Sequence, residues 1–221
     1  MGRGRGFLPF SPFPLSRPLR GKMIKIVSGP ALEPISYIQV LDHLRMPSTD
    51  EQIDASSQDT IERLIKAVRV HFESTILNRA LITQKWKLYL DSFPICDHID
   101  IPLPPLQSSG LSFKYTDSGG TETTMTVTTD YLVDTVSEPG RIVLPYNGIW
   151  PLTELYPVNP IVIEYQCGYG LTPEDVPSEI RQAMLIMIAD LYDNREDLVE
   201  KAMSNLKTVD RLLSGYRIIP V

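Results

Sequence analysis

The stretch from residue 178 to residue 193 limits the possible folds more than any other part of the sequence. Pro177 and Glu179 are typical of a helix start, because proline suits the first helical position and an acid complements the positive helix end. The apolar residues that follow recur at helical spacing, and further ones fill the opposite side: Ile180, Ala183, Met184, Met187, Ile188, Leu191 and Tyr192, then Leu185, Ile186 and Ala189. A helix that is apolar nearly all round must be covered, so we expect it at the centre of a helical body.

Three further helices are predicted. The first begins at Ser36, because Ser36 and Gln39 have capping-box spacing, and it ends before Pro47. The second runs from about Ser57 to Leu77, and Asn78 suits the left-handed conformation that often ends a helix. The last follows residues 193–197 and runs to about Ser214. Apolar stripes support all three: Tyr37, Val40, Leu41 and Leu44; Ile61, Leu64, Ile65, Val68, Phe72 and Ile76; Leu198, Ala202, Leu206, Val209 and Leu213.

Between the second and third helices the apolar pattern alternates, which is typical of strands. Trp86, Leu88 and Leu90 begin the pattern, and residues 111–127 predict a hairpin that turns at 117–120. A second hairpin is expected around Glu138-Pro139-Gly140, with a type II turn that places its glycine at positive φ. The remaining strands are expected within 98–103, 130–136, 140–146 and 160–170.

We therefore predict an α+β fold, a four-helix bundle with a small antiparallel β-sandwich or barrel inserted between helices two and three. The boundaries are 1–22 for a basic N-terminal arm, 23–80 plus 174–221 for the helical bundle with a C-terminal tail, and 81–173 for the inserted β lobe. Four helices leave the ends of the apolar third helix exposed, so we expect a neighbouring copy to cover part of it.

The first 22 residues differ from the rest in charge and composition. They hold five basic residues and no acid, so the net charge of −6 corresponds to −11 for the remaining chain. Glycine and proline prevent a helix here. Three interpretations remain open: an arm on a neighbouring subunit, a disordered tail, and an extension ahead of a start at Met23. In the first, the contacts are Arg3, Arg5, Phe7, Phe10 and Phe13.

Only residues 96–100 resemble a metal or catalytic cluster. In an alternating strand Cys96, His98 and Asp100 would face one side and Asp97 the other. No second cluster supplies an obvious fourth ligand for zinc. Motifs typical of phosphate-binding loops, serine hydrolases and zinc proteases are missing from the sequence. We therefore expect no catalysis, no cofactor and no metal.

The sequence offers no obvious membrane segment or secretion signal. Its longest apolar run, Met184–Ala189, is far shorter than the ~20 residues that span a bilayer. Prolines interrupt the apolar part of the N-terminus, unlike a signal peptide. We expect a soluble protein made in the cytoplasm, with no membrane partner and with separate reduced thiols at Cys96 and Cys167.

Several segments occur in the order found in one family of tailed-phage proteins. They are NRALITQKWKLYLDSFP, IDIPLPPLQS, DYLVDTVSEPGRIVLPYNGIWP, IVIEYQCGYG, DVPSEIRQAMLIMIADLYDNRE and LLSGYRI. The set resembles the head–tail connector, or adaptor, family of the gp6-like kind, which also occurs in prophages and gene transfer agents. The resemblance covers about residues 34–218. The arm at 1–22 departs from it, and so does Asn78, where relatives often have a glycine before the arginine.

The resemblance implies a structural protein of the virion neck, at the head–tail junction, that resides in the host cytoplasm before assembly. Such adaptors form a homo-oligomeric ring, commonly of twelve subunits, under the portal protein. The ring extends the DNA channel and docks the next component, a head-completion (stopper) or tail protein. Genomic DNA would pass through the lumen without specific binding, which an acidic body permits. The family's C-terminal portal contact maps here to Leu212, Leu213, Tyr216, Arg217, Ile218 and Ile219.

Two other functions remain open at the level of sequence. The basic arm at 1–22 is compatible with a nucleic-acid-binding accessory protein. The cluster at 96–100 is compatible with a hydrolase, although no nucleophile is obviously joined to a base.

Overall fold

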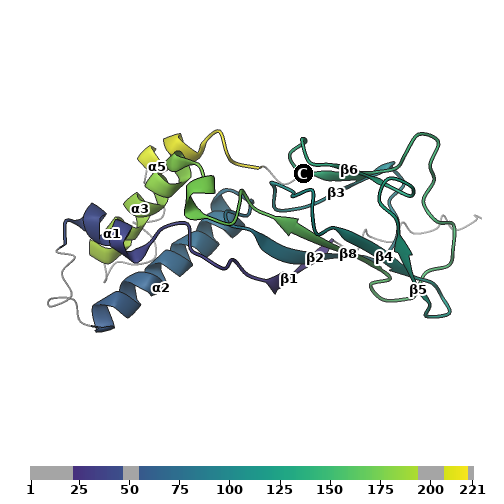
Figure 1. The fold of residues 1–221 in the computed structure, drawn as a ribbon, viewed down its shortest axis with the longest axis horizontal. Coiled ribbons are helices and arrows are strands. Elements are labelled where there is room, and N and C mark those ends of the chain that lie inside the picture. The colour runs from purple at the N-terminus through teal and green to yellow at the C-terminus, as the bar shows by residue number, and fades with distance from the viewer. Residues whose placement is uncertain (1–21, 47–54, 194–206, 219–221) are drawn as a thin grey trace, which may run out of the picture.

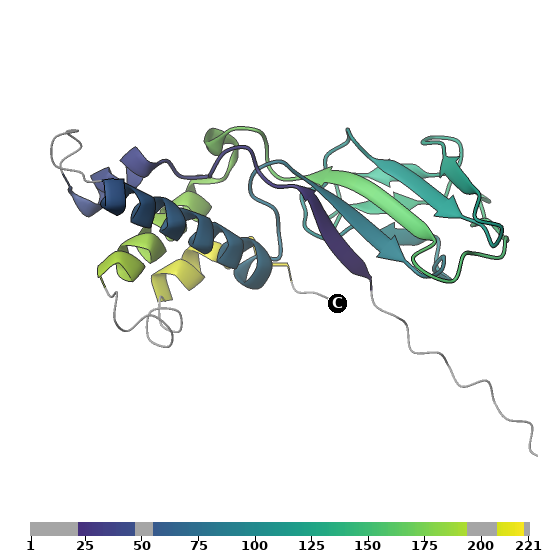
Figure 2. The ribbon, with the colours of Figure 1, turned by 90° about the horizontal axis from the view of Figure 1, so that it is seen from below.

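The protein is elongated, with helices at one end and strands at the other (Figure 1). The structure, a computed structural model, describes residues 22–46, 55–193 and 207–218. Within these residues, no helix is both long and apolar enough to cross a membrane. Turning the molecule by 90° keeps the same division, with the helices grouped beyond the end of the larger sheet (Figure 2).

The described helical part consists of four α-helices and two short turns of other helix types. Their bounds are α1 Tyr37–Leu44, α2 Ala55–His71, the π-helical turn η1 Phe72–Ile76, the 3₁₀ turn η2 Pro173–Asp175, α3 Ser178–Asp193 and α5 Lys207–Leu213. The predicted capping box of α1 is confirmed, because the Gln39 N–H donates to Ser36 Oγ and the Ser36 N–H donates to Gln39 Oε1. The second helix was predicted to run to about Leu77; the structure has α2 to His71 and then the π-helical turn η1 to Ile76.

α3 packs against α1, α2 and α5. Five of its side chains are buried in the helical core: Ile180, Ala183, Met184, Met187 and Ile188. The apolar residues on its other side, including Leu185 and Ile186, are half-buried against the same core. No large apolar side chain of α3 is among the exposed ones. The neighbouring copy expected to cover part of this helix stays a prediction.

Eight strands form two antiparallel sheets within the described residues. The larger has the order β1-β2-β8-β4-β5 and the smaller the order β3-β7-β6. The strands are β1 Met23–Ser28, β2 Gln84–Leu90, β3 His98–Asp100, β4 Ser112–Thr116, β5 Glu122–Met125, β6 Leu132–Asp134, β7 Arg141–Val143 and β8 Ile161–Cys167. The predicted hairpin over 111–127 is confirmed as β4 and β5, with Phe113 opposite Met125.

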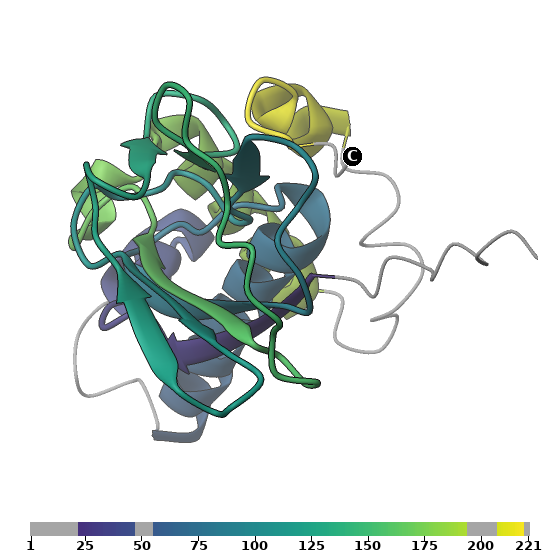
Figure 3. The same ribbon diagram turned by 90° about the vertical axis from the view of Figure 1, so that its right-hand side faces the viewer.

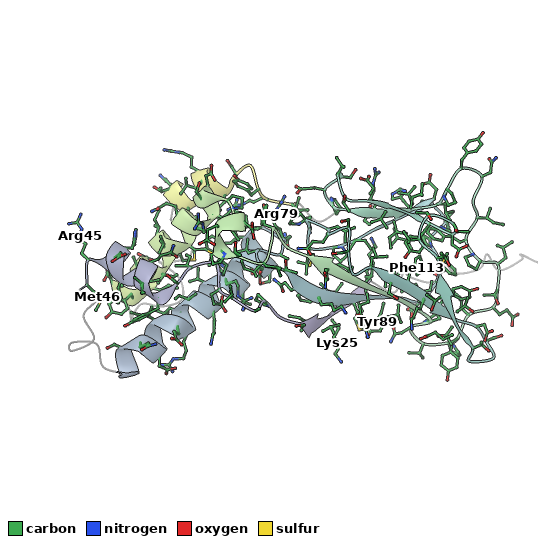
Figure 4. The ribbon with its side chains drawn as sticks, viewed as in Figure 1. Lys25, Arg45, Met46, Arg79, Tyr89 and Phe113 are labelled. Atoms are coloured by element: carbon green, nitrogen blue, oxygen red, sulfur yellow. The ribbon has the colours of Figure 1, made fainter. Side chains whose placement is uncertain are left out.

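The facing surfaces of the two sheets enclose a second apolar core, separate from the helical one. Leu88, Phe113 and Ile163 lie on the inner face of the larger sheet and are fully buried, and Ile142 meets them from the smaller sheet. Figure 3 views the strands from the end away from the helices, and Figure 4 places Phe113 between the two sheets.

The predicted four-helix bundle with a β lobe inserted between helices two and three is wrong. The protein is a mixed α/β fold in which β1 precedes α1 and pairs with β2, so the larger sheet begins before the first helix. α1 has 8 residues and α3 has 16, so α1 covers only part of the length of α3 and is not a full-length member of a bundle. Sequence reasoning missed β1 because its apolar residues, in MIKIVS, do not alternate cleanly.

Exposed large apolar side chains lie mainly on β1 and in loops, with Ile38 on α1, Val70 on α2, Leu132 on β6 and none on α3. On β1 they are Met23, Ile24, Ile26 and Val27, all at least 38% exposed. In loops at the end away from the helices they include Ile95, Tyr146, Ile149 and Leu152. Surplus apolar surface is therefore present, but in a different place from the one the sequence indicated.

Candidate functional site

The helices and the sheets meet around Arg79, whose side chain is buried between them (Figure 4). Asn78 has φ 52°, so the predicted left-handed residue at the end of the second helix is confirmed. This turn directs the chain from η1 toward β2. It leaves Leu77 and Leu81 in the helical core and Ala80 in the core between the sheets.

Arg79 joins three segments that are distant in sequence. Its guanidinium donates two hydrogen bonds to the carboxylate of Glu138, at 3.0 and 2.6 Å. It also donates to the Tyr169 hydroxyl at 3.0 Å and to the carbonyl oxygen of Tyr216 at 2.9 Å. The guanidinium carbon lies 5.7 Å from the Tyr169 ring centroid. A planar fork of five donors can bind all these groups at once, which a lysine cannot.

The charges at this junction favour the ionised arginine. Burial alone would lower the pKa of Arg79, but the hydrogen bonds and charge of Glu138 and the contact with Tyr169 raise it above its ordinary value. Burial raises the pKa of the Tyr169 phenol, which keeps it a neutral hydrogen-bonding partner. The junction therefore combines one permanent cation with one carboxylate, and it acts as a structural clamp.

A second polar cluster supports the helical side of the same junction. The carboxylate of Glu73, in η1, accepts hydrogen bonds from the Leu81 N–H at 2.9 Å, from Gln84 and from Arg69. Arg69 also donates to Glu33, at 2.7 Å. Burial raises the pKa of Glu73, while the Leu81 N–H and Arg69 partly oppose that shift. These bonds tie α2 and η1 to the start of β2.

The β6–β7 turn carries Glu138 to Arg79. A type II turn with a left-handed glycine was predicted here, and that prediction is wrong because Gly140 does not have a positive φ. The glycine is required for space, since a Cβ at Gly140 would lie 2.5 Å from the Leu106 Cβ. Asp134 holds the turn by accepting from the Ser137 hydroxyl and from Arg141, both at 2.7 Å.

We expect Asp134→Asn to destabilise the protein at neutral pH and to have less effect in acid. Hydrogen bonds from Ser137 and Arg141 hold the pKa of Asp134 well below its usual range. A lowered folded-state pKa stabilises the fold above the unfolded pKa of about 3.9, and that stability is lost as pH falls through the folded value. The difference in melting temperature between the wild type and Asp134→Asn should therefore shrink progressively below about pH 4. A difference in melting temperature that grows in acid would contradict this role of Asp134. The control is Asp59→Asn, because Asp59 belongs to an exposed ion pair on a helix.

The predicted portal-contact residues divide between the interior and the surface. Leu213 is fully buried and Leu212 half-buried in the helical core. The Tyr216 hydroxyl donates to Glu179, and Arg217 pairs with Asp210 at 2.6 Å. The main chain of Ile218 is held by Leu77 and Asn78: its N–H donates to the Leu77 carbonyl, and its carbonyl accepts from the Asn78 amide, both at 3.0 Å. Ile219 lies outside the described residues.

The predicted arm contacts also lie outside the described residues: Arg3, Arg5, Phe7, Phe10 and Phe13. The arm therefore stays a prediction. The described chain begins at Lys22, whose Nζ donates to the Asp100 carbonyl at 3.2 Å.

The 96–100 cluster does not adopt the predicted alternation. β3 begins only at His98, so Cys96 and Asp97 precede the strand, and His98 Nδ1 lies 2.9 Å from the neighbouring Asp97 Oδ1. The Cys96 thiol donates to the His98 carbonyl rather than to its ring. Across 22–46, 55–193 and 207–218, no three histidine, cysteine or acidic side chains are placed to hold a metal ion. Cys96 and Cys167 are both free thiols, as predicted.

An aromatic cluster fixes the loops farthest from the helices. The Phe93 and Trp150 rings stack with centroids 5.5 Å apart, and Phe93 also contacts Phe113 and Tyr115. The Trp150 indole donates to the Cys96 carbonyl at 2.8 Å, which joins the two loops. A cleft opens beside β5, and its lining includes Thr123, Met125, Ile149, Trp150 and Leu152.

Sequence reasoning missed the Arg79 clamp. Arg79 interrupts the apolar segment ILNRALI, and Glu73 precedes it in FESTIL, so charged residues amid apolar ones were the available signal. The partners could not be identified in this way, because Glu138 and Tyr216 lie 59 and 137 positions from Arg79.

Solved structures with the same fold come from gene transfer agent particles. A chain from the neck of an empty particle, computed with C6 symmetry, has a TM-score of 0.73 and 20% identity. A chain from the virion of a native particle has a TM-score of 0.71 and 18% identity. A chain from the neck of a native particle, computed with C12 symmetry, has a TM-score of 0.65 and 19% identity. Each likeness covers 90% of this chain and 97% of the other chain. No family model and no curated protein matches the sequence.

Proposed function

We propose that the protein is a structural head–tail connector, or adaptor, in the neck of a tailed phage or phage-like particle. In this role it forms a ring under the portal, extends the DNA channel and docks the next neck or tail component. The main support for this proposal is the fold that the protein shares with chains from particle necks computed with C6 and C12 symmetry. The likeness extends over nearly the whole length of those chains. The ordered segments of the sequence support the same role independently.

The charge and architecture are compatible with a passive conduit. The chain outside residues 1–22 carries a net charge of −11, so DNA phosphates gain few attractive contacts from it. The Arg79 clamp fixes the helices relative to the sheets with charged hydrogen bonds. A rigid two-part subunit suits a ring that transmits the position of one neck layer to the next.

The test is assembly of the purified full chain with the portal protein encoded by the same particle. We expect ring-shaped complexes in electron micrographs and co-sedimentation with the portal. Particles made without the protein should contain heads that lack attached tails. The role is wrong if the protein remains monomeric at high concentration, never co-sediments with the portal, and can be removed without loss of tails.

A further inference from the structure

The larger sheet has an unusual free edge at β1. Among residues 22–46, 55–193 and 207–218, β1 is the end strand of the sheet and pairs only with β2, and all six of its residues are exposed. Met23–Ser28 contains one charged residue, Lys25, and no proline. Edge strands of soluble proteins usually carry charges or prolines that prevent pairing with another chain. The apolar side chains of β1 therefore mark it as a site for strand addition.

The other free edge belongs to β5 (Glu122–Met125). Within the described chain, the backbone bonds of these four residues are those of the ladder with β4. The two edges differ in sequence, so joining one to the other gives a head-to-tail contact. Contacts of this heterologous kind generate rings.

The register shows which side chains of the two edges share a face. Ile24 and Ile26 lie opposite Leu88 and Trp86, on the inner face that also carries Met125 of β5. Lys25 lies opposite Lys87 on the outer face, where it points away from the smaller sheet (Figure 4).

The same register places Glu122 of β5 on the outer face. On the inner face, β1 carries Ile24 and Ile26, and β5 carries Thr123 and Met125. On the outer face, β1 carries Lys25 and β5 carries Glu122, which pairs with Lys114 of its own copy at 2.7 Å. Lys25 belongs to none of the ion pairs among the described residues, whereas Lys87 opposite it pairs with Glu164 at 3.2 Å. Like charges opposite one another in a sheet are unfavourable, so an acid from a neighbouring copy would give Lys25 a partner.

We propose that β1 of one copy adds to β5 of the next copy and continues the larger sheet around the ring. Ile24 and Ile26 enter the cleft beside β5, and Lys25 pairs with Glu122 of the neighbouring copy. Each neighbouring pair of strands within the larger sheet is antiparallel, so β1 and β5, the first and fifth of its five strands, run in the same direction. When two copies are related by a small rotation, β1 of one and β5 of the next therefore form a parallel pair. This inference rests on the proposed ring and specifies its subunit contact.

The first test is disulfide trapping in the full chain with the exposed Cys96 replaced by serine. Lys25→Cys is combined with Glu122→Cys or with Thr124→Cys, the next outer-face position on β5. Each copy of a double variant carries one new cysteine on β1 and one on β5. Under mild oxidation, at least one of the two double variants should therefore give a ladder of covalent oligomers. The single-cysteine variants should give none.

The second test is charge reversal, measured by mass photometry. Lys25→Glu should raise the concentration for half-assembly about tenfold, and adding Glu122→Lys should lower it again. Glu122→Lys alone should also weaken assembly, but it breaks the pair with Lys114 in its own copy, so the comparison of Lys25→Glu with the double reversal decides. Arg63→Glu, on the exposed face of α2, is the matched control and should not change assembly.

The outcomes separate this contact from the proposed function. Rings that form without a ladder, and that tolerate both reversals, would overturn the β1–β5 contact and leave the adaptor role intact. A covalent dimer from Lys25→Cys alone would overturn it in favour of β1 pairing with β1. Failure of every variant and of the wild type to form rings or bind the portal would reject the adaptor role itself.

Discussion

Replacing Arg79 by methionine is expected to lower the free energy of unfolding by about 3 kcal/mol. Methionine has a similar length but donates no hydrogen bond. The Tyr216 carbonyl and the Tyr169 hydroxyl would lose their partner inside the junction. Glu138 is 42% exposed and can be hydrated, so the loss should lie at the lower end of the range for broken buried pairs.

Urea unfolding of the wild type, Arg79→Met and Arg63→Met gives the comparison. Arg63 and Asp59 are each more than two-thirds exposed, so Arg63→Met should change the free energy of unfolding by less than about 0.5 kcal/mol. Arg79→Lys should be intermediate, because an ammonium group cannot bind Glu138, Tyr169 and Tyr216 together. Equal stability of Arg79→Met and Arg63→Met would show that the clamp contributes nothing.

The parts of the fold that depend on local chemistry were predictable from the sequence. The capping box at Ser36 and the left-handed Asn78 need only neighbouring residues, and both are confirmed. The β4–β5 hairpin follows from alternation around a turn. In each case the physical cause lies within a few positions of the element it determines.

The parts that depend on distant partners were not predictable in this way. β1 becomes a strand because β2, some 60 residues later, offers an edge for pairing. Gly140 was explained by turn geometry, although its real constraint is the side chain of Leu106. By contrast, the central position of α3 was predictable, and α1, α2 and α5 do pack against that helix. Composition indicated surplus apolar surface without indicating where it lies.

Replacing Leu213 by alanine should be the most informative change in the C-terminal segment. Leu213 is fully buried in the helical core, so its truncation should cost about 2–5 kcal/mol of stability. If Leu213 instead lay on the surface and contacted only the portal, Leu213→Ala would be as stable as the wild type. The measurement is the urea midpoint of Leu213→Ala beside that of Arg217→Ala.

Arg217 provides the matched variant because it lies in the same segment but on the surface. Its side chain is 42% exposed and pairs with Asp210, so Arg217→Ala should change stability by less than about 0.5 kcal/mol. If the C-terminal segment binds the portal, Arg217→Ala should fold normally and co-sediment with the portal less strongly. Leu213→Ala should lose portal binding only under conditions in which the variant is itself unfolded. Stable Leu213→Ala that fails to bind would place this leucine in the interface and would mean that α5 leaves the helical core on assembly.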